Sequence, residues 1–249
     1  MIPRRPPRIA DGQEYIDLQA DDTELAASLD HVAAVNRWLG GTRALLRVLD
    51  PLLPVSGPVS FLDVGTGSAD IPRALAAWCT ARGRHFRVVA ADRQPQTAAL
   101  AHHLTRPFPN IFVLRADVLR LPFRDHAFDF ALFSLTLHHL DDDVQPLALR
   151  ELARVARRAV IVSELERSWP NYFGAALLAA TVWRRNRLTR HDAPLSVRRA
   201  FTSAELLAIA REAGFADATV HQNFFERLVL VLDHAPGGTI FRPGQPLVT

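Results

Sequence analysis

The stretch FLDVGTGSAD, residues 61–70, decides the fold of this chain. An apolar run carries the carboxylate of Asp63 near its end, and a turn of small residues containing Gly65 and Gly67 then leads into a helical pattern. A buried strand that passes through a glycine turn into a helix is typical of the first unit of a parallel α/β sheet. The two glycines leave backbone amides open to a ligand that any side chain would keep away.

The alternation of short apolar runs and helical patterns continues downstream of this stretch. The runs at 59–64, 86–91, 111–114, 128–133 and 159–163 predict buried parallel strands, and the patterns at 69–82, 95–104 and 142–156 predict the helices between them. A helix over 203–213 precedes two further runs, 218–222 and 227–232, separated by only four residues, so the last strand can return antiparallel. The sequence therefore predicts a doubly wound, seven-stranded α/β sheet, mostly parallel with an antiparallel strand in a C-terminal hairpin.

Three segments do not follow this alternation of strand and helix patterns. Residues 1–14 are rich in Pro and Arg and predict a loose arm, and helical spacing over 23–49, broken at Gly40 and Gly41, predicts two covering helices. The alternation also stops between residues 165 and 202, which predicts a lid insert. We therefore expect an arm and helical cover over 1–54, a sheet domain over 55–234 that contains the insert, and a surface tail over 235–249.

Composition narrows the function classes. The chain is 49% hydrophobic and 22% charged with a net charge of +3, and all of its basic residues are arginines scattered along the sequence, which disfavours a nucleic-acid partner. Cys79 is the one cysteine, so neither an intramolecular disulfide nor a thiolate metal cluster can form. The N-terminus lacks a secretory apolar region, and the apolar stretch 172–183 is too short to span a bilayer. We expect a cytoplasmic protein without stable membrane insertion, and a homodimer is compatible with the sequence.

Acidic residues mark the ends of three predicted strands. Asp63 can receive a ligand ammonium, Asp92 can accept hydrogen bonds from both hydroxyls of a ribose, and Asp117 can accept from an exocyclic amine of adenine while Val118 packs on the ring. Taken singly, Asp92 could be a helix N-cap and Asp117 a turn residue. Three acids at successive strand ends favour a cofactor site instead, and Asp70 in the glycine turn would repel a pyrophosphate.

With these motifs, residues 59–232 resemble the class I S-adenosylmethionine-dependent methyltransferases. The segments 121–130, 134–140 and 150–155 are similar to that family's regions around its fourth and fifth strands. The resemblance implies a Rossmann-like sheet and S-adenosylmethionine as the cofactor, with neither a metal nor a covalent nucleophile. The implied cofactor residues are Asp63, Gly65 and Gly67 at the methionine part, Asp92 at the ribose, Asp117 and Val118 at the adenine, and Ser134 at the methionyl end. Thr66 and Arg93, which adjoin these residues, are also expected to bind the cofactor. Many relatives have glycine where this chain has Ala69, and we expect tight packing there.

The acceptor would lie at the carboxyl ends of the strands, below the N-terminal helices and the insert. Arg37, Trp38, Trp169 and Tyr172 are the candidate substrate-binding residues, although Arg37 could equally be a surface arginine. His139 follows the fourth strand and is a candidate general base, or else a residue that caps the following loop, and His138 is expected to face away. His191 beside Asp192 is a second candidate base, or an ordinary pair of neighbours in a turn.

These features predict a small-molecule methyltransferase of secondary metabolism. It would methylate oxygen or carbon of an aromatic, polyketide-like or quinone-like compound. The segment after the fourth strand lacks the Asn/Asp-Pro-Pro-Tyr pattern in which amino-methylating nucleic-acid enzymes resemble one another. Two alternatives stay open, a nicotinamide-dependent oxidoreductase, which Asp70 disfavours, and a non-catalytic module that binds S-adenosylmethionine.

Overall fold

A computed structural model describes residues 3–10, 12–18, 21–223 and 226–233 of the chain. Its strands are β1 (Val59–Val64), β2 (Phe86–Asp92), β3 (Ile111–Arg115), β4 (Phe128–Ser134), β5 (Ala156–Leu165), β6 (Thr219–Asn223) and β7 (Arg227–Asp233). Its α-helices are α1 (Asp22–Trp38), α2 (Gly41–Leu49), α3 (Asp70–Ala81), α4 (Pro95–Thr105), α5 (Gln145–Val155), α6 (Trp169–Ala180), α7 (Arg187–Arg199) and α8 (Ser203–Glu212). Three short 3-10 turns complete the order, η1 (Tyr15–Asp17), η2 (Asp50–Leu52) and η3 (Leu137–His139).

The strands form one sheet with the order β3-β2-β1-β4-β5-β7-β6. The pairs from β3 to β5 are parallel, whereas β7 runs antiparallel to both β5 and β6. The predicted architecture is therefore confirmed, and the strand order reverses between β1 and β4. In a sheet of this kind the crevice at that reversal, outside the carboxyl ends of the strands, is the place for a ligand.

Helices cover both faces of the sheet. One apolar core joins α2 and α3 to one face through residues such as Leu45, Leu75 and Phe61. The other core joins α5 and α8 to the opposite face through residues such as Leu149 and Leu206. These cores fix β1, β2 and β4, so that the loops after them are held at one edge.

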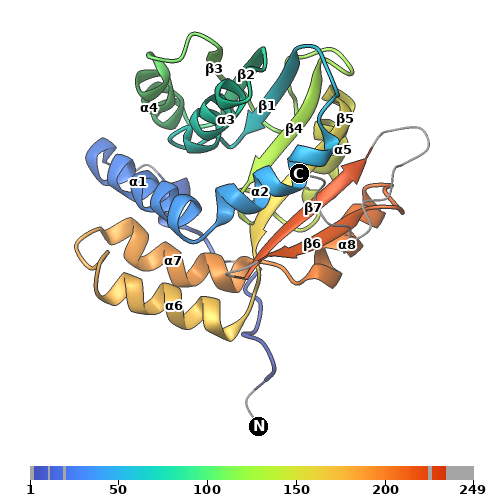
Figure 1. Cartoon of the computed structure of the whole chain (residues 1–249). Helices are drawn as coiled ribbons and strands as arrows, with labels where there is room; N and C mark the ends of the chain where they lie inside the picture. Colours follow the sequence, from blue (N-terminus) through green and yellow to red (C-terminus); the bar gives the residue numbers. More distant parts are fainter. Residues whose placement is uncertain (1–2, 11, 19–20, 224–225, 234–249) are drawn as a thin grey trace.

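The insert and the N-terminal helix α1 gather at that edge. Figure 1 shows α1, α6 and α7 side by side at one end of the sheet, with α6 and α7 packed as a pair of helices. Leu25 and Leu29 of α1 meet Leu188 of α7 in a small apolar cluster. The first helix of the predicted cover and the predicted lid therefore form one helical layer, whereas the second, α2, packs on a face of the sheet.

The segment before α1 is part of this layer. The backbone N–H of Ile9 donates to the carbonyl of Arg198, and the guanidinium of Arg167 donates to the carbonyl of Pro6 at 2.8 Å. The indole of Trp169 donates to the carbonyl of Pro3 at 2.8 Å. The expectation of a loose arm over residues 1–14 is wrong for the described residues 3–10 and 12–14, because the insert supplies hydrogen-bond partners along that segment. The predicted tail over 235–249 lies outside the described residues.

Candidate functional site

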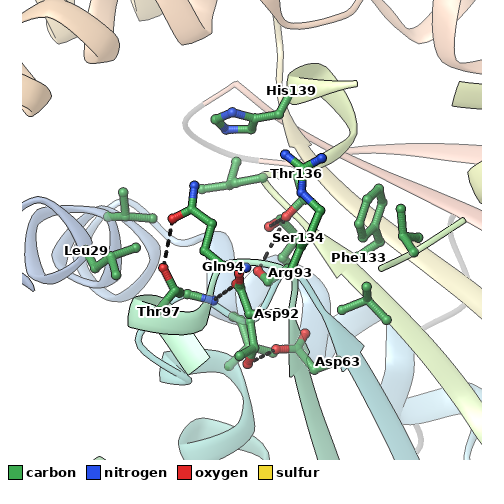
Figure 2. Close-up of a pocket in the computed structure, with 18 of the residues that line it drawn as sticks. Leu29, Asp63, Asp92, Arg93, Gln94, Thr97, Phe133, Ser134, Thr136 and His139 are labelled. Carbon is green, nitrogen blue, oxygen red and sulfur yellow. Dashed lines mark hydrogen bonds between the residues drawn. The ribbon is translucent and has the colours of Figure 1, made fainter. Parts of the chain in front are cut away.

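A cavity of about 210 Å³ opens at the carboxyl ends of β1, β2 and β4. All nine predicted cofactor residues line it, namely Asp63, Gly65, Thr66, Gly67, Asp92, Arg93, Asp117, Val118 and Ser134. The parallel register explains this convergence, since Asp63 lies beside Ala90 in β2 and Leu132 in β4. Figure 2 shows Asp63 and Asp92 at the ends of their strands, with the His139 ring on the opposite side of the drawn residues. We call this space the cofactor cavity.

The turn after β1 has a backbone that needs glycine. Gly65 has φ +64°, and a Cβ added there would lie 2.4 Å from the Thr136 hydroxyl oxygen. Gly67 has φ +55° and Ala69 has φ 57°, so three residues of this turn are left-handed. Ala69 is fully buried at the start of α3, which agrees with the expectation of tight packing there. With no side chains on its glycines, the turn lets backbone peptide groups form part of the cavity wall.

Two strand-end carboxylates brace this turn. The Thr66 hydroxyl donates to Asp63 Oδ2 at 2.6 Å, and the backbone N–H of Gly67 donates to Asp92 Oδ2 at 3.1 Å. The other Asp92 oxygen accepts from the backbone N–H of Gln94 at 3.0 Å. Each carboxylate oxygen has a second lone pair, so these bonds leave capacity for a ligand hydroxyl or ammonium.

The cofactor cavity is crowded with acids. Burial, together with the nearby carboxylates of Asp70 and Asp92, raises the pKa of Asp63 to about 8, against the opposing hydrogen bond from Thr66. Burial also raises the pKa of Asp92 and of Asp70, whose Oδ2 accepts from the Asn36 amide at 3.0 Å. Acids in such surroundings are stabilised by a cationic ligand and destabilised further by a pyrophosphate. The electrostatics thus favour a ligand that carries an ammonium or a sulfonium.

Two buried hydroxyls in the cofactor cavity lack partners within the described residues. Ser68 Oγ and Ser134 Oγ both line the cavity, and neither has a hydrogen bond there. Buried polar atoms are normally paired, so unpaired ones in a cavity wall suit a polar ligand. Together with the glycine turn and the acids, they make the cavity fit S-adenosylmethionine, the cofactor that the resemblance implies.

The raised pKa of Asp63 leads to a prediction about protons. Below pH 8 the Asp63 carboxyl tends to hold a proton in the ligand-free protein, and a ligand ammonium favours its ionised form. We expect S-adenosylhomocysteine binding at neutral pH to release up to about one proton. Calorimetric titrations in two buffers with different ionisation enthalpies would measure this release. The Asp63→Asn variant should release none, and equal enthalpies for the native protein in both buffers would contradict the assignment.

A second cavity, of about 430 Å³, adjoins the first. We call it the acceptor cavity. The two share Ile16, Val32, Leu135 and His139 as lining residues, so they meet at the loop after β4. Its remaining walls come from the segment before α1, from α1, and from α6 and α7 of the insert. The mostly apolar lining includes Val35, Leu39, Leu178, Trp183 and Val197.

Two histidines with carboxylate partners line the acceptor cavity. His139 Nδ1 lies 2.7 Å from Asp17 Oδ2, and His138 Nδ1 lies 2.7 Å from Glu164 Oε2. Burial alone would lower the pKa of His139, but the carboxylates of Glu14, Asp17 and Glu164 outweigh it and raise the pKa to about 9. The expectation that His138 faces away is wrong, because Glu164 at the end of β5 holds its ring against the cavity. His139 lines both cavities in the turn after β4, and its role as a base stays a prediction.

The other candidate residues lie outside both cavities. Trp38 is 70% exposed, and the guanidinium of Arg37 stacks 4.9 Å from its ring on the outer surface. Trp169 and Tyr172 pack against Phe173 at the start of α6. The structure does not bring these four predicted substrate residues to the acceptor cavity.

His191 also lies outside both cavities. Its ring stacks on Tyr15 at 3.7 Å between centroids, and its Nδ1 lies 2.7 Å from Asp192. Asp192 in turn accepts from the backbone N–H groups of Tyr15 and Ile16. This geometry makes His191 part of the contact that fixes the segment before α1, which is a structural alternative to the predicted role as a base.

Four functional candidates escaped the sequence analysis. Glu14 and Asp17 reach the histidines from the segment before α1, and Asn36 of α1 reaches Asp70. Arg227 is fully buried at the start of β7 with both terminal nitrogens unpaired among the described residues, and burial lowers its pKa to about 10 against the attraction of Glu164 and Asp70. The helical spacing of Leu29, Val32 and Asn36 could have revealed Asn36, because these three share one face of α1.

Comparisons with known proteins agree with this geometry. A family model described as a methyltransferase domain matches residues 62–162. This chain carries a class I S-adenosylmethionine-dependent methyltransferase domain. The predicted family is therefore confirmed, and the matched segment runs from β1 through β5, which includes the glycine turn and the strand-end acids.

Relatives of this methyltransferase domain include two quinone methyltransferases. The demethylmenaquinone methyltransferase of Staphylococcus haemolyticus is 31% identical over 109 residues, which cover 44% of each chain. The 2-phytyl-1,4-naphtoquinone methyltransferase of Trichormus variabilis is 32% identical over 154 residues, which cover 59% of this chain and 66% of that protein. The chain thus spans about half to two thirds of the length of these relatives.

Solved structures share the fold of the methyltransferase domain. A SAM-dependent methyltransferase from Aquifex aeolicus superposes with a TM-score of 0.59 at 18% identity, covering 86% of this chain and 98% of that one. Human N-acetylserotonin methyltransferase in complex with SAM superposes with a TM-score of 0.60 at 15% identity, covering 86% of this chain and 56% of that one. Among the described residues of this chain, no helix has the length and apolar character to cross a membrane.

Proposed function

We propose that this protein transfers a methyl group from S-adenosylmethionine to oxygen or carbon of a small, largely apolar acceptor. The observation that carries the proposal is the junction of the two cavities at Leu135 and His139. A ligand with a sulfonium fits the acid-lined cavity, and an acceptor in the adjoining apolar cavity would approach it through that junction.

Different residues of the cofactor cavity suit different parts of S-adenosylmethionine. Asp63 and the unpaired Ser134 hydroxyl suit the amino-acid end of the cofactor, Asp92 suits a ribose diol, and Asp117 with Val118 suits the adenine. S-adenosylmethionine, when bound, supplies an activated methyl group on a positively charged sulfur. The chain then has to orient the acceptor and exclude water, which accounts for much of the rate that such a site can provide.

The acceptor cavity supports an aromatic, polyketide-like or quinone-like compound. Its walls are apolar, while His138, His139 and Glu14 place polar groups at one end. Such a lining suits a ring system that carries a hydroxyl or an acidic carbon. The two relatives named for quinone methylation support the same acceptor class.

The histidines suit an acceptor that has to lose a proton. Each imidazole is oriented by a carboxylate at Nδ1, which leaves Nε2 toward the cavity. With a pKa of about 9, His139 is protonated at neutral pH and serves there as a hydrogen-bond donor. A role for His139 as a general base therefore requires a change in that charge when ligands bind.

A variant that fills only the acceptor cavity would test the proposal. Ala175 of α6 lines that cavity and not the cofactor cavity, whereas Ala180 at the end of the same helix is exposed. We expect Ala175→Trp to lower turnover at least tenfold while leaving S-adenosylhomocysteine affinity unchanged, because its side chain takes up acceptor volume. Ala180→Trp should behave like the native protein.

The assay is formation of S-adenosylhomocysteine from S-adenosylmethionine with a panel of phenols, hydroquinones and naphthohydroquinones. Methylated product seen by mass spectrometry with at least one acceptor, and lost in Ala175→Trp, supports the proposal. Binding of S-adenosylhomocysteine without turnover on the whole panel would favour a non-catalytic binding module. A thermal shift with nicotinamide dinucleotides in place of S-adenosylhomocysteine would favour the oxidoreductase. The cytoplasmic location and the homodimer remain predictions. Cell fractionation would test the location, and light scattering would test the oligomeric state.

A further inference from the structure

Glu14, His138 and His139 bring three ligand atoms of metal-binding type together at the polar end of the acceptor cavity. One oxygen or nitrogen from each residue lies within 4.8 Å of the other two. Glu14 and His138 are only 2% and 3% exposed, and the His139 side chain is 19% exposed. The residues come from two distant parts of the sequence, the segment before α1 and the turn η3.

The hydrogen bonds of the two imidazoles fix which nitrogen faces the cluster. Each Nδ1 lies 2.7 Å from a carboxylate oxygen, of Glu164 for His138 and of Asp17 for His139. A carboxylate accepts, so each Nδ1 is the donor, and Nε2 is the atom left to coordinate. A carboxylate that binds the far nitrogen of a histidine is the usual outer partner of a metal-ligating imidazole.

The distances between the facing atoms match a place for an ion rather than direct hydrogen bonds. His138 Nε2 lies 3.8 Å from Glu14 Oε1, and His139 Nε2 lies 3.8 Å from Glu14 Oε2. Both distances are too long for hydrogen bonds. Two ligands of a tetrahedral Zn²⁺ are roughly 3.3 Å apart, so a shift of about half an ångström would bring each pair to that spacing.

An unpaired oxygen of Glu14 supports the metal site independently of these distances. Its Oε1 is buried and has no hydrogen bond within the described part of the chain, although its Oε2 accepts from the Ser196 hydroxyl at 2.7 Å. Arg199 lies 3.8 Å from Oε1, too far for a hydrogen bond, and Arg227 is attracted to Glu164 rather than paired with Glu14. A dication at the cluster would pair the orphaned oxygen.

We propose that Glu14, His138 and His139 bind one divalent transition-metal ion. Two histidines and one carboxylate form a known set for Zn²⁺ and for Fe²⁺, and such sites keep open positions for a further ligand. Those positions face the acceptor cavity, so the ion would bind a hydroxyl or enol oxygen of the acceptor. Binding of the metal stands by itself, whereas this role in holding the acceptor rests on the proposed methyl transfer.

Metal content of tag-free protein tests the site. After treatment with a chelator, the protein is dialysed against Zn²⁺ at about pH 8, because protons compete with the ion for the imidazole nitrogens and a higher pH favours the ion. The bound ion is counted by mass spectrometry. We expect one ion per chain in the native protein and less than a tenth of an ion in Glu14→Gln and in His139→Gln. The exposed His102 of α4 gives the matched control, and His102→Gln should retain the ion.

Two further measurements separate loss of the site from loss of the fold. Asp17→Asn leaves the three ligands in place but weakens the partner of His139, so it should bind Co²⁺ about tenfold to a hundredfold more weakly, as followed by visible absorption. S-adenosylhomocysteine affinity should stay native in Glu14→Gln, because Glu14 lines only the acceptor cavity. Native protein that holds no more Zn²⁺ than Glu14→Gln would overturn the metal site, and this outcome is independent of whether the cofactor binds.

Discussion

Replacing Gly65 by alanine should remove cofactor binding and destabilise the fold by about 2–5 kcal/mol. The new Cβ would lie 2.4 Å from Thr136 Oγ1 and 2.5 Å from its methyl carbon, and the backbone has φ +64°. Thr136 cannot turn away easily, because its hydroxyl donates to the carbonyl of Ser134 at 2.8 Å. Relief of the clash would have to move the glycine turn or the loop after β4, and both line the cofactor cavity.

Gly83 offers a matched control for this substitution. It has a similar φ of +62°, but an added Cβ would meet nothing within 4 Å. Gly83→Ala should therefore show only the backbone cost of about 1–2 kcal/mol and native affinity for S-adenosylhomocysteine. Thermal unfolding and calorimetric titration of both variants make the comparison. Equal stability and equal affinity in the two variants would show that the close approach of Thr136 to the turn is unimportant.

Asp92→Asn should weaken S-adenosylhomocysteine binding by about 100-fold or more, equivalent to about 3 kcal/mol. The two Asp92 oxygens accept from the backbone N–H groups of Gly67 and Gln94. An amide NH₂ would face one of these donors and could not accept from it or from a ribose hydroxyl. The substitution thus removes a ligand contact and a brace of the glycine turn together.

The exposed Asp143 in the loop before α5 gives the control for charge, and Asp143→Asn should bind normally. Burial raises the pKa of Asp92, so burying its charge carries a cost that the neutral amide of Asp92→Asn does not have, and loss of the charge by itself should not unfold the protein. Calorimetric titration measures both affinities. An unchanged dissociation constant in Asp92→Asn would falsify the assignment of this carboxylate to the cofactor.

The cofactor half of the site could be predicted from sequence because local patterns determine it. Each acid follows a buried run, and parallel strands carry their ends to the same edge whatever their loops contain. The nine predicted cofactor residues all line one cavity for this reason. Most helices and strands begin and end within a few residues of their predicted bounds. Strand β5 is longer than the apolar run 159–163 that predicted it.

The acceptor half could be predicted only as a region. Leu29, Val32 and Asn36 of α1 line the cofactor cavity, and Arg37, one residue further, is rotated by about 100° to the outer surface. The aromatic character of Trp38 and Trp169 favoured them as binding residues, but the phase of each helix places them elsewhere. Periodicity along α1 carried enough information to exclude Arg37.

Contacts between distant segments were beyond the sequence analysis. Glu14 meets Ser196 across 182 residues, and Asp17 meets His139 across 122. The segment that contains them has no helical or strand periodicity, and its Pro and Arg residues resemble those of a disordered arm. Its structure comes from hydrogen-bond partners in an insert near the other end of the chain, which no local pattern encodes.

The docking of residues 3–10 and 12–18 onto the insert has a consequence for the two cavities. The nine predicted cofactor residues all lie between residues 63 and 134, although α1 and the segment before it complete the wall of their cavity. The acceptor cavity, in contrast, takes most of its walls from the segment before α1, from α1 and from the insert. Replacing the docked residues 3–9 by a flexible linker should therefore lower turnover more than it lowers the affinity for the methyl donor, because these residues contact the insert and line neither cavity.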